Sequence, residues 1–303
     1  MKVALLHHVR LPVSGYGGTE RVVVWLARGL AERGHAVTLL APHGSRVPEA
    51  RLVPLDAAAA ERIDFDPRPH LPPGVEVLHA HRPIGPFPDL PALWTLHGLP
   101  SRATYPPNLV ALSADHARRS CADAWVHNGL DPSEYRFGPV KRGFDLFLGR
   151  LHREKGWRWA VHGARASRRR LVVAGGWRPS LRTGLRYAGT VQDEGKRELL
   201  ADAACLWMPA LWDEPFGLTL VEALVSGTPV LGTRRGALPE VVTPEVGCLG
   251  NTLEELVALR NAIDRVDPAA CRARAVERFT HRRMAEDYEQ LYRRVVRTGS
   301  LSG

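Results

Sequence analysis

Two glutamates on either side of a Pro-Phe-Gly turn have the types and spacing that could do chemistry. Glu214 precedes the turn, and Glu222 lies eight positions later in the apolar run Leu218–Val225, which reads as a helix. The amides of Phe216 and Gly217 would then lie at a helix start with unsatisfied donors, which is an anion site. A carboxylate on a covered helix face is costly unless it is hydrogen-bonded, and two sugar hydroxyls would satisfy Glu222. Alone, either glutamate also fits a solvated side chain or a residue that stabilises the helix dipole.

A basic pair, Arg150 and Lys155, follows the apolar stretch Phe144–Leu148. If that stretch is a strand, the guanidinium lies at the carboxyl edge of a parallel sheet, where ligands bind. Arginine supplies a planar bidentate donor and lysine a mobile point charge, which together suit a diphosphate. The stretches LVVAGG (Leu171–Gly176) and YAGTV (Tyr187–Val191) would bring glycines and backbone groups to the same edge.

Short apolar runs alternate with helical patterns along almost the whole chain. This alternation predicts an α/β architecture of parallel sheets covered on both faces by helices. The predicted strands are Val3–Leu6, Val37–Leu40, Val75–His79, Ala92–Leu96, Leu109–Leu112, Trp125–His127, Phe144–Leu148, Leu171–Ala174, Ala204–Trp207 and Val230–Leu231. Further predicted helices are Thr19–Arg33, Lys196–Asp202, Leu253–Ala262 and His281–Val296.

The length of 303 residues indicates two domains, since a domain has about 150 residues. The polar stretch Asp131–Gly143, punctuated by glycine and proline, separates two sets of strands of doubly wound size. We therefore predict domains at residues 1–138 and 139–280. A last helix in residues 281–303 carries a one-sided apolar stripe that another element must cover.

The formal charge of +9, from 41 basic and 32 acidic residues, favours anionic partners. Much of it is arginine spread over the segments Arg168–Arg170, Arg282-Arg283 and Arg293-Arg294, and no recognition-helix signature appears, so we predict no nucleic-acid partner. The last helix leaves a peripheral contact with acidic lipid open, although its basic residues are interspersed with acidic ones.

The composition excludes several other classes of protein. The N-terminus is too short an apolar run for a secretory signal, and no run reaches the ~20 apolar residues of a spanning helix. The four cysteines form no CxxC pair, so we expect reduced packing residues in a cytoplasmic protein. None of the 13 histidines shows a strong metal-ligand spacing, and we predict no metal site. Asp64-Phe65-Asp66 fits a surface loop, although its spacing leaves a metal-binding DxD open.

In their order along the chain, these motifs resemble the retaining family 4 glycosyltransferases of GT-B fold, also called glycosyl transferases group 1. The two glutamates with their FG turn are the most specific piece, together with the GRLxxxKG pattern. The motifs are GYGGTERVVV (Gly15–Val24), TLHG (Thr95–Gly98), HNGLD (His127–Asp131), LGRLHREKG (Leu148–Gly156), VVAGG (Val172–Gly176), YAGTV, EPFGLTLVEALVSGTPVLGT (Glu214–Thr233) and LPEVV (Leu238–Val242).

The resemblance implies two Rossmann-like domains that face across a cleft, the first for the acceptor and the second for the nucleotide sugar. It also implies that the last helix returns to the first domain; packing on the C-terminal core is the alternative. Glu222 would bind the ribose and Glu214 the transferred sugar, while Arg150 and Lys155 would stabilise the departing diphosphate and His97 would face the sugar. The implied donor-binding positions besides Glu222 are Gly17, Gly18, Gly149, Gly175, Thr190, Val191, Phe216, Gly217, Leu218 and Thr219.

The same resemblance implies transfer with retention, with no strong general base, no divalent metal and no cofactor besides the nucleotide diphosphate sugar as co-substrate. UDP is preferred on family frequency, and the acceptor is a hydroxyl group. The chain departs from the family at Arg234–Ala237, where a second glycine is usual, and in its short first domain, which usually chooses the acceptor.

Three alternatives remain open. A nucleotide-sugar epimerase or hydrolase would share the fold and need no acceptor. A dinucleotide-dependent oxidoreductase is suggested only by the glycine cluster Gly15–Gly18, which lies too far from the first strand for the Rossmann fingerprint. A non-catalytic nucleotide-sugar-binding protein is disfavoured by the intact acidic and basic pairs.

Overall fold

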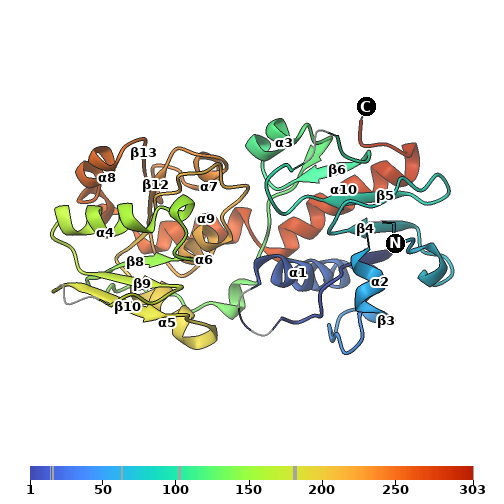
Figure 1. The fold of residues 1–303 in the computed structure, drawn as a ribbon, viewed down its shortest axis with the longest axis horizontal. Helices are drawn as coiled ribbons and strands as arrows, with labels where there is room; N and C mark the ends of the chain where they lie inside the picture. Colours follow the sequence, from blue (N-terminus) through green and yellow to red (C-terminus); the bar gives the residue numbers. More distant parts are fainter. Residues whose placement is uncertain (14, 16, 63, 102–103, 180–182, 303) are drawn as a thin grey trace. The chain divides into compact units, whose positions relative to one another are not determined.

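A computed structural model describes residues 1–13, 15, 17–62, 64–101, 104–179 and 183–302 of the chain. The fold divides into two compact units, and each is described by itself (Figure 1). Unit 1 comprises Met1–Leu130 and Thr280–Gly303, and unit 2 comprises Asp131–Phe279. Each unit is built on its own parallel sheet, so the predicted α/β class with two doubly wound sheets is confirmed.

In the described part of unit 1, seven parallel strands follow the order β3-β2-β1-β4-β5-β6-β7. Val3 of β1 lies opposite Val37 of β2 and Val77 of β4. The order of the strands therefore reverses beside β1, because β2 and β3 lie on one side of it and β4 to β7 on the other. The strands are β1 (Lys2–Leu6), β2 (Ala36–Pro42), β3 (Arg51–Leu55), β4 (Val77–Ala80), β5 (Ala92–Thr95), β6 (Leu109–Ala111) and β7 (Ala124–Trp125).

In the described part of unit 2, six parallel strands follow the order β10-β9-β8-β11-β12-β13. Asp145 at the start of β8 lies opposite Leu171 of β9 and Cys205 of β11. The strands are β8 (Asp145–Leu148), β9 (Leu171–Ala174), β10 (Leu185–Gly189), β11 (Cys205–Met208), β12 (Val230–Thr233) and β13 (Gly247–Gly250).

Helices cover both faces of the sheet of unit 1. Helix α10 lies beside α1 (Figure 1) and contacts β4 and β5. Gly29 permits this approach, because a Cβ there would lie 2.5 Å from the carbonyl oxygen of His281. The apolar stripe of α10 is buried against unit 1, and Ala60 of α2 packs on the opposite face of the sheet. The helices are α1 (Gly18–Glu32), α2 (Ala57–Glu61), α3 (Ala114–Ser120) and α10 (His281–Thr298), with a 3-10 turn η1 (Arg68–His70).

One face of the sheet of unit 2 packs on α4, α8 and η4, where Trp207 of β11 is fully buried. Helices α6 and α9 pack on each other, and α6 contacts β11 and β12. The helical segments are η2 (Pro132–Glu134), η3 (Arg153–Lys155), α4 (Trp157–Ala166), α5 (Asp193–Asp202), α6 (Leu218–Val225), α7 (Leu238–Val241), α8 (Leu253–Leu259), η4 (Ala262–Arg265) and α9 (Pro268–Arg278).

Three strands, β3, β10 and β13, were not predicted. Strand β3 contains a proline, which an edge strand tolerates, and β13 has the weak strand sequence GCLG.

Cys121 is exposed at the end of α3, which corrects its interpretation as a packing residue. Within the described residues, no helix combines the length and apolar character that crossing a bilayer requires.

Candidate functional site

The candidate site in unit 2 lies where the strand order of its sheet reverses. From β8 the successive strands β9 and β10 are added on one side of the sheet, and from β11 the strands β12 and β13 are added on the other side. Ligands of open parallel sheets bind at the carboxyl ends of the two strands between which this order reverses. Gly149 and the exposed Arg150 directly follow β8, and the segment that carries Glu214 follows β11. The fold therefore brings the predicted cationic and acidic residues of unit 2 to one sheet edge.

Glycines let the strand ends of this edge approach one another. Gly175 follows β9 with a φ of +113°, and a Cβ there would lie 2.2 Å from the carbonyl oxygen of Gly149. The Gly175 amide donates a hydrogen bond of 2.7 Å to the carbonyl of Gly189 at the end of β10. Beyond β10, Thr190 is exposed and Val191 is half-buried at the same edge.

Lys155 and Glu214 form an ion pair of 2.7 Å between Nζ and Oε2. The turn that carries Lys155 packs directly on the segment after β11, because a Cβ on Gly156 would lie 1.7 Å from the carbonyl oxygen of Pro209. The ammonium also lies 4.2 Å from the ring centroid of Trp212, a cation–π contact that the sequence did not suggest. The two charged side chains are only 15% and 11% exposed, so the pair is largely desolvated.

The helix start beside this pair carries amides that face the same edge. Gly217 precedes α6 with a φ of +82°, and no described side chain caps the helix. Phe216 is buried and packs edge-on against Phe279 at 5.9 Å between ring centroids, which anchors the turn. Leu218 and Thr219, at the first positions of α6, are half-buried. An uncapped helix N-terminus of this kind attracts an anion.

Glu222 is buried within α6, where its side chain is 2% exposed. Its Oε1 atom accepts a hydrogen bond of 2.8 Å from the Tyr135 hydroxyl and one of 2.5 Å from Nζ of Lys196. These two partners stabilise a buried carboxylate, and neither was a predicted site residue. Lys196 was within a predicted helix, but nothing in its spacing pointed to a residue 26 positions away.

The segment Arg234–Ala237, where the sequence departs from the family motif, packs tightly against the site. Gly236 has a φ of +57°, and a Cβ there would lie 2.3 Å from the carbonyl oxygen of Glu214. The amide of the buried Ala237 donates to the same carbonyl at 2.9 Å. One glycine in this segment therefore suffices to hold the backbone of Glu214.

A buried ion pair fixes β8, which positions Gly149 and Arg150. The carboxylate of Asp145 accepts hydrogen bonds from Nε and Nη2 of Arg260 at 2.7 and 2.5 Å, and from Nε1 of Trp207 at 2.7 Å. Asp145 and Arg260 are both fully buried. Burial would lower the pKa of the guanidinium, but the hydrogen bond to Asp145 holds it above its ordinary value, so the arginine stays charged.

In unit 1, the predicted glycines lie at the start of α1. Gly17 precedes the helix, and a Cβ there would lie 2.4 Å from Cγ1 of Val13 and 2.6 Å from Oε2 of Glu20. Gly18 is the first residue of α1, and Tyr16 of the same motif lies outside the described residues. The carboxylate of Glu20 lies 3.8 Å from Nε2 of His7, which follows β1.

His97 follows β5 and belongs to a cluster of imidazoles at the carboxyl edge of unit 1. Its Nε2 lies 2.9 Å from Nδ1 of His81, which continues β4. Desolvation and the proximity of His7 lower the pKa of His97 to about 3, so its ring is neutral at pH 7. Burial likewise holds the pKa of His81 well below its ordinary value. A neutral imidazole offers one donor and one acceptor to a hydroxyl group.

The DxD triplet is held in arginine pairs. Arg62 donates two hydrogen bonds to Asp64, at 2.9 and 2.7 Å. Arg68 bonds both oxygens of Asp66, and these bonds lower the pKa of each carboxyl. Among the described residues, no group of three or more histidine, cysteine, aspartate or glutamate side chains is placed to hold a metal ion.

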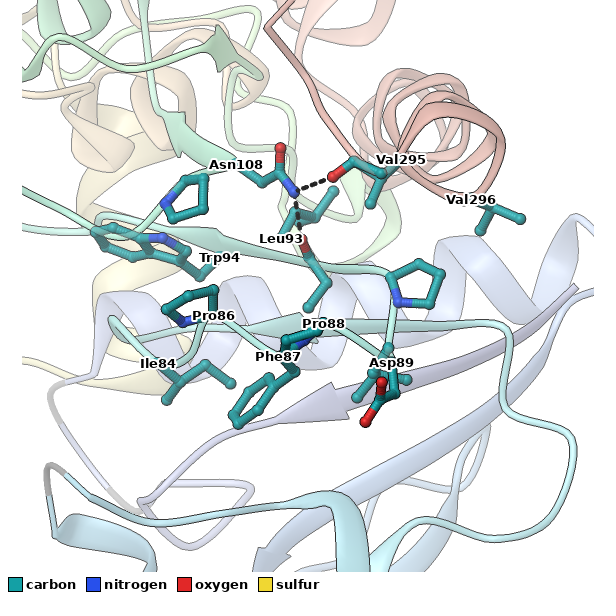
Figure 2. Close-up of a pocket in the computed structure, with 15 residues that line it drawn as sticks. Ile84, Pro86, Phe87, Pro88, Asp89, Leu93, Trp94, Asn108, Val295 and Val296 are labelled. Carbon is teal, nitrogen blue, oxygen red and sulfur yellow. Dashed lines mark hydrogen bonds between the residues drawn. The ribbon is translucent and has the colours of Figure 1, made fainter.

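A cavity of about 360 Å³ in unit 1 lies apart from the predicted site residues. Figure 2 shows Trp94, Phe87 and prolines lining it, with Val295 and Val296 of α10 on one side. Asn108 donates hydrogen bonds there to the carbonyls of Ala92 and Gly299, so its amide ties the end of α10 to the sheet. None of the residues predicted to bind a donor lines this cavity.

Comparison with known proteins places the chain among sugar-transferring enzymes. Residues 145–266 match the family model described as Glycosyl transferases group 1. The chain is 30% identical to AviGT4, a glycosyltransferase involved in avilamycin A biosynthesis, whose crystal structure matches with a TM-score of 0.80 over 98% of each chain.

Two further proteins illustrate the breadth of the likeness. The phosphatidyl-myo-inositol mannosyltransferase of Mycobacterium leprae (strain TN) is 27% identical, over 94% of this chain and 95% of that protein. The crystal structure of Anabaena HepE in complex with UDP and glucose has a TM-score of 0.66 at 15% identity, over 96% of this chain and 99% of that one. At that identity the likeness concerns the fold alone, and the predicted GT-B fold class is confirmed.

Proposed function

Because this chain is a glycosyltransferase that belongs to the group 1 family, we propose that it transfers a hexose from a nucleotide diphosphate sugar to an acceptor hydroxyl group, with retention of anomeric configuration. A UDP-sugar is the preferred donor. The observation that carries the proposal is the carboxyl edge of unit 2, where a desolvated Lys155–Glu214 pair adjoins an uncapped helix start.

The donor diphosphate is assigned to the start of α6. Its amides and the side chains of Arg150 and Lys155 supply donors and positive charge to two phosphates. Lys155 already lies beside Glu214, so a bound diphosphate would share this ammonium with the carboxylate. Glu222 is assigned to the ribose and Glu214 to the hydroxyls of the transferred sugar. Gly149 and Gly175 allow the ligand to approach the backbone of the strand ends.

Stabilisation of the leaving group is the main catalytic contribution in this proposal. Arg150, Lys155 and the helix amides offset the charge that develops on the departing nucleoside diphosphate. That diphosphate then accepts the acceptor proton on the same face of the sugar, without a divalent metal. His97 is assigned to a sugar hydroxyl, since a ring with a pKa of about 3 donates or accepts a hydrogen bond but is a weak base.

The acceptor hydroxyl is assigned to the carboxyl edge of unit 1. Both ring nitrogens of the buried His7, and Nε2 of His81, have no hydrogen-bond partner among the described residues. These nitrogens are shielded from solvent in the structure, so an acceptor hydroxyl would satisfy them only after a local rearrangement of the edge.

Calorimetric titration with UDP, GDP, ADP and dTDP tests the assignment of the donor site. We expect the native chain to prefer one nucleotide, and Glu222→Gln to weaken its binding about tenfold or more, because a hydrogen bond to a charged group contributes about 1.5–3 kcal/mol. Glu198→Gln, an exposed change on the neighbouring α5, is the matched control and should leave binding unchanged.

Equal binding of every nucleotide by native and Glu222→Gln proteins, or no binding by either, contradicts the proposal. With the preferred donor in hand, a sugar product formed without acceptor would indicate an epimerase or hydrolase. Hydride transfer with NAD(P) would indicate an oxidoreductase. The anomeric configuration of the transferred sugar, read by NMR coupling constants, tests retention.

A further inference from the structure

Six arginines from separate segments of unit 2 surround two adjoining cavities. The cavities have volumes of about 560 and 430 Å³, and both are lined by Arg170, Leu171 and Leu185. These volumes lie in the range of small-molecule sites, roughly 300–1,000 Å³. The arginines are Arg142, Arg165, Arg168, Arg169, Arg170 and Arg186.

The cavities lie at the sheet edge opposite the candidate donor site. Arg170 directly precedes β9, Gly184 directly precedes β10, and Phe144 directly precedes β8. The predicted donor-binding residues follow the carboxyl ends of the same strands, which at four residues are about 13 Å long. None of the predicted site residues lines either cavity, so this location is separate from the proposed reaction.

The cavities carry positive charge that the protein does not neutralise. No acidic side chain is among the described residues that line them. Arg142 pairs with Asp202 and Arg169 with Asp264, so four of the six arginines have no carboxylate partner within the described part of the chain. Arg170, one of these four, donates to the backbone carbonyls of Arg142 and Gly143.

The side chains of three of these arginines make no hydrogen bond or ion pair with any other described residue. They are Arg165, Arg168 and Arg186. Some arginines elsewhere in this basic chain are matched by nearby carboxylates. The matched pairs include Arg282 with Glu32, Arg283 with Asp287, Arg293 with Glu289 and Arg119 with Asp115. Other exposed arginines, such as Arg51, Arg278 and Arg297, also lack a carboxylate partner among the described residues, so this location is distinguished by the gathering of four such arginines around two adjoining cavities.

From this arrangement we infer that the cavity pair binds a ligand with at least two phosphate groups. A phosphomonoester carries about −1.5 to −2 charges at pH 7, so two of them match four uncompensated arginines. Guanidinium groups bind phosphate oxygens in bidentate pairs. The half-buried Leu185 and Val161 supply an apolar surface for the carbon skeleton between the phosphates. The phosphates can belong to a soluble metabolite or to lipid headgroups.

Titration of the full chain with tripolyphosphate tests the site for soluble ligands. All proteins carry Arg150→Gln and Lys155→Gln, so that the donor edge contributes little binding. The site variant adds Arg165→Gln, Arg168→Gln and Arg186→Gln. The control adds Arg51→Gln, Arg278→Gln and Arg297→Gln, three exposed arginines outside both cavities, and so removes the same total charge. A second arm measures co-sedimentation with phosphatidylcholine vesicles with and without phosphatidylglycerol.

We expect the site variant to bind tripolyphosphate about tenfold or more weakly than the control variant, since several charge-assisted contacts are lost. Lysine in place of the same three arginines should restore part of the affinity by restoring the charge. Loss confined to the vesicle arm supports the same site with lipid headgroups as its ligand. Equal binding by the site and control variants in both arms, or no binding in either arm, overturns the inference. Thermal unfolding of each variant confirms that the exposed changes leave the fold intact.

Discussion

The ammonium nitrogen of Lys196 lies 2.5 Å from Oε1 of Glu222, a carboxylate whose side chain is only 2% exposed. The Tyr135 hydroxyl bonds the same oxygen at 2.8 Å. Both partners limit the rotation of the buried carboxylate and offset the cost of its burial with hydrogen bonds. The residue assigned to the ribose is thus oriented from two other segments of unit 2.

Lys196→Met should weaken nucleotide binding about tenfold or more, because it leaves a buried carboxylate without its charged partner. It should also reduce the preference for UDP over 2′-deoxy-UDP, since a misplaced Glu222 no longer selects the ribose hydroxyls. Calorimetry with the two nucleotides measures both effects.

Lys141→Met is the matched control for that experiment. Lys141 is another largely buried lysine of unit 2, and it donates to the Ala201 carbonyl and the Thr228 hydroxyl at 2.9 Å each. Its loss should lower the thermal stability without changing the preference for ribose. An unchanged preference in Lys196→Met would show that the ion pair serves stability alone.

Gly175→Ala tests the close approach of the strand ends. An alanine there would have its Cβ 2.2 Å from the carbonyl oxygen of Gly149, in a backbone conformation with a φ of +113°. We expect a loss of about 2–5 kcal/mol of unfolding free energy, from strain and steric overlap together. Gly189→Ala separates the two causes, because its φ is also positive but no atom lies within 4 Å of the added Cβ. Urea unfolding should show a loss of only about 1–2 kcal/mol for this control.

Arg260→Met tests the buried ion pair beneath β8. The change leaves the fully buried Asp145 without its charged partner, so we expect a loss of about 3–5 kcal/mol of unfolding free energy. Asp145→Asn in the same protein should recover part of that loss. Arg283→Met, which removes an exposed helical pair with Asp287, should cost about 0.5 kcal/mol or less. Equal losses in the two single variants would contradict the assigned importance of burial.

The sequence predicted the elements whose local signals agree with their place in the fold. Leu171–Ala174 and Leu218–Val225 have the predicted bounds, because one is a continuous apolar strand and the other is an apolar run that follows Gly217. Strands β3 and β13 were missed because proline and glycine weaken their local pattern, whereas pairing with β2 and β12 stabilises them.

Contacts between distant positions could not be predicted from spacing. Glu222 lies 87 positions from Tyr135, and Arg260 lies 115 positions from Asp145. Glu214 and Lys155 were each named from their motifs, but only the packing of Gly156 on Pro209 explains why they form a pair. The arginines of the cavity pair looked scattered along the chain, and the sheet gathers them at one edge.

The imidazole cluster of unit 1 gives the chain a defined sensitivity to acid. The pKa of His97 is lowered to about 3 in the folded state, chiefly by desolvation, from an ordinary value of 6.5. Between these values the unfolded state binds a proton that the folded state does not, so stability falls as the pH drops from 6.5 towards 3. The stability that is lost on acidification in this way is fully present above pH 6.5.

His97→Asn removes this group, so stability should fall less steeply between pH 6.5 and 3 than in the native chain. Hydrogen exchange of amides in β1 and β4 measures the local stability of unit 1 at each pH. His43→Asn, a change at an exposed histidine of the same unit, is the control and should leave the slope as it is in the native chain. If the native chain and His97→Asn lose protection in parallel over this range, the pKa of His97 is not lowered in the folded state, and its buried ring is not a source of the acid sensitivity.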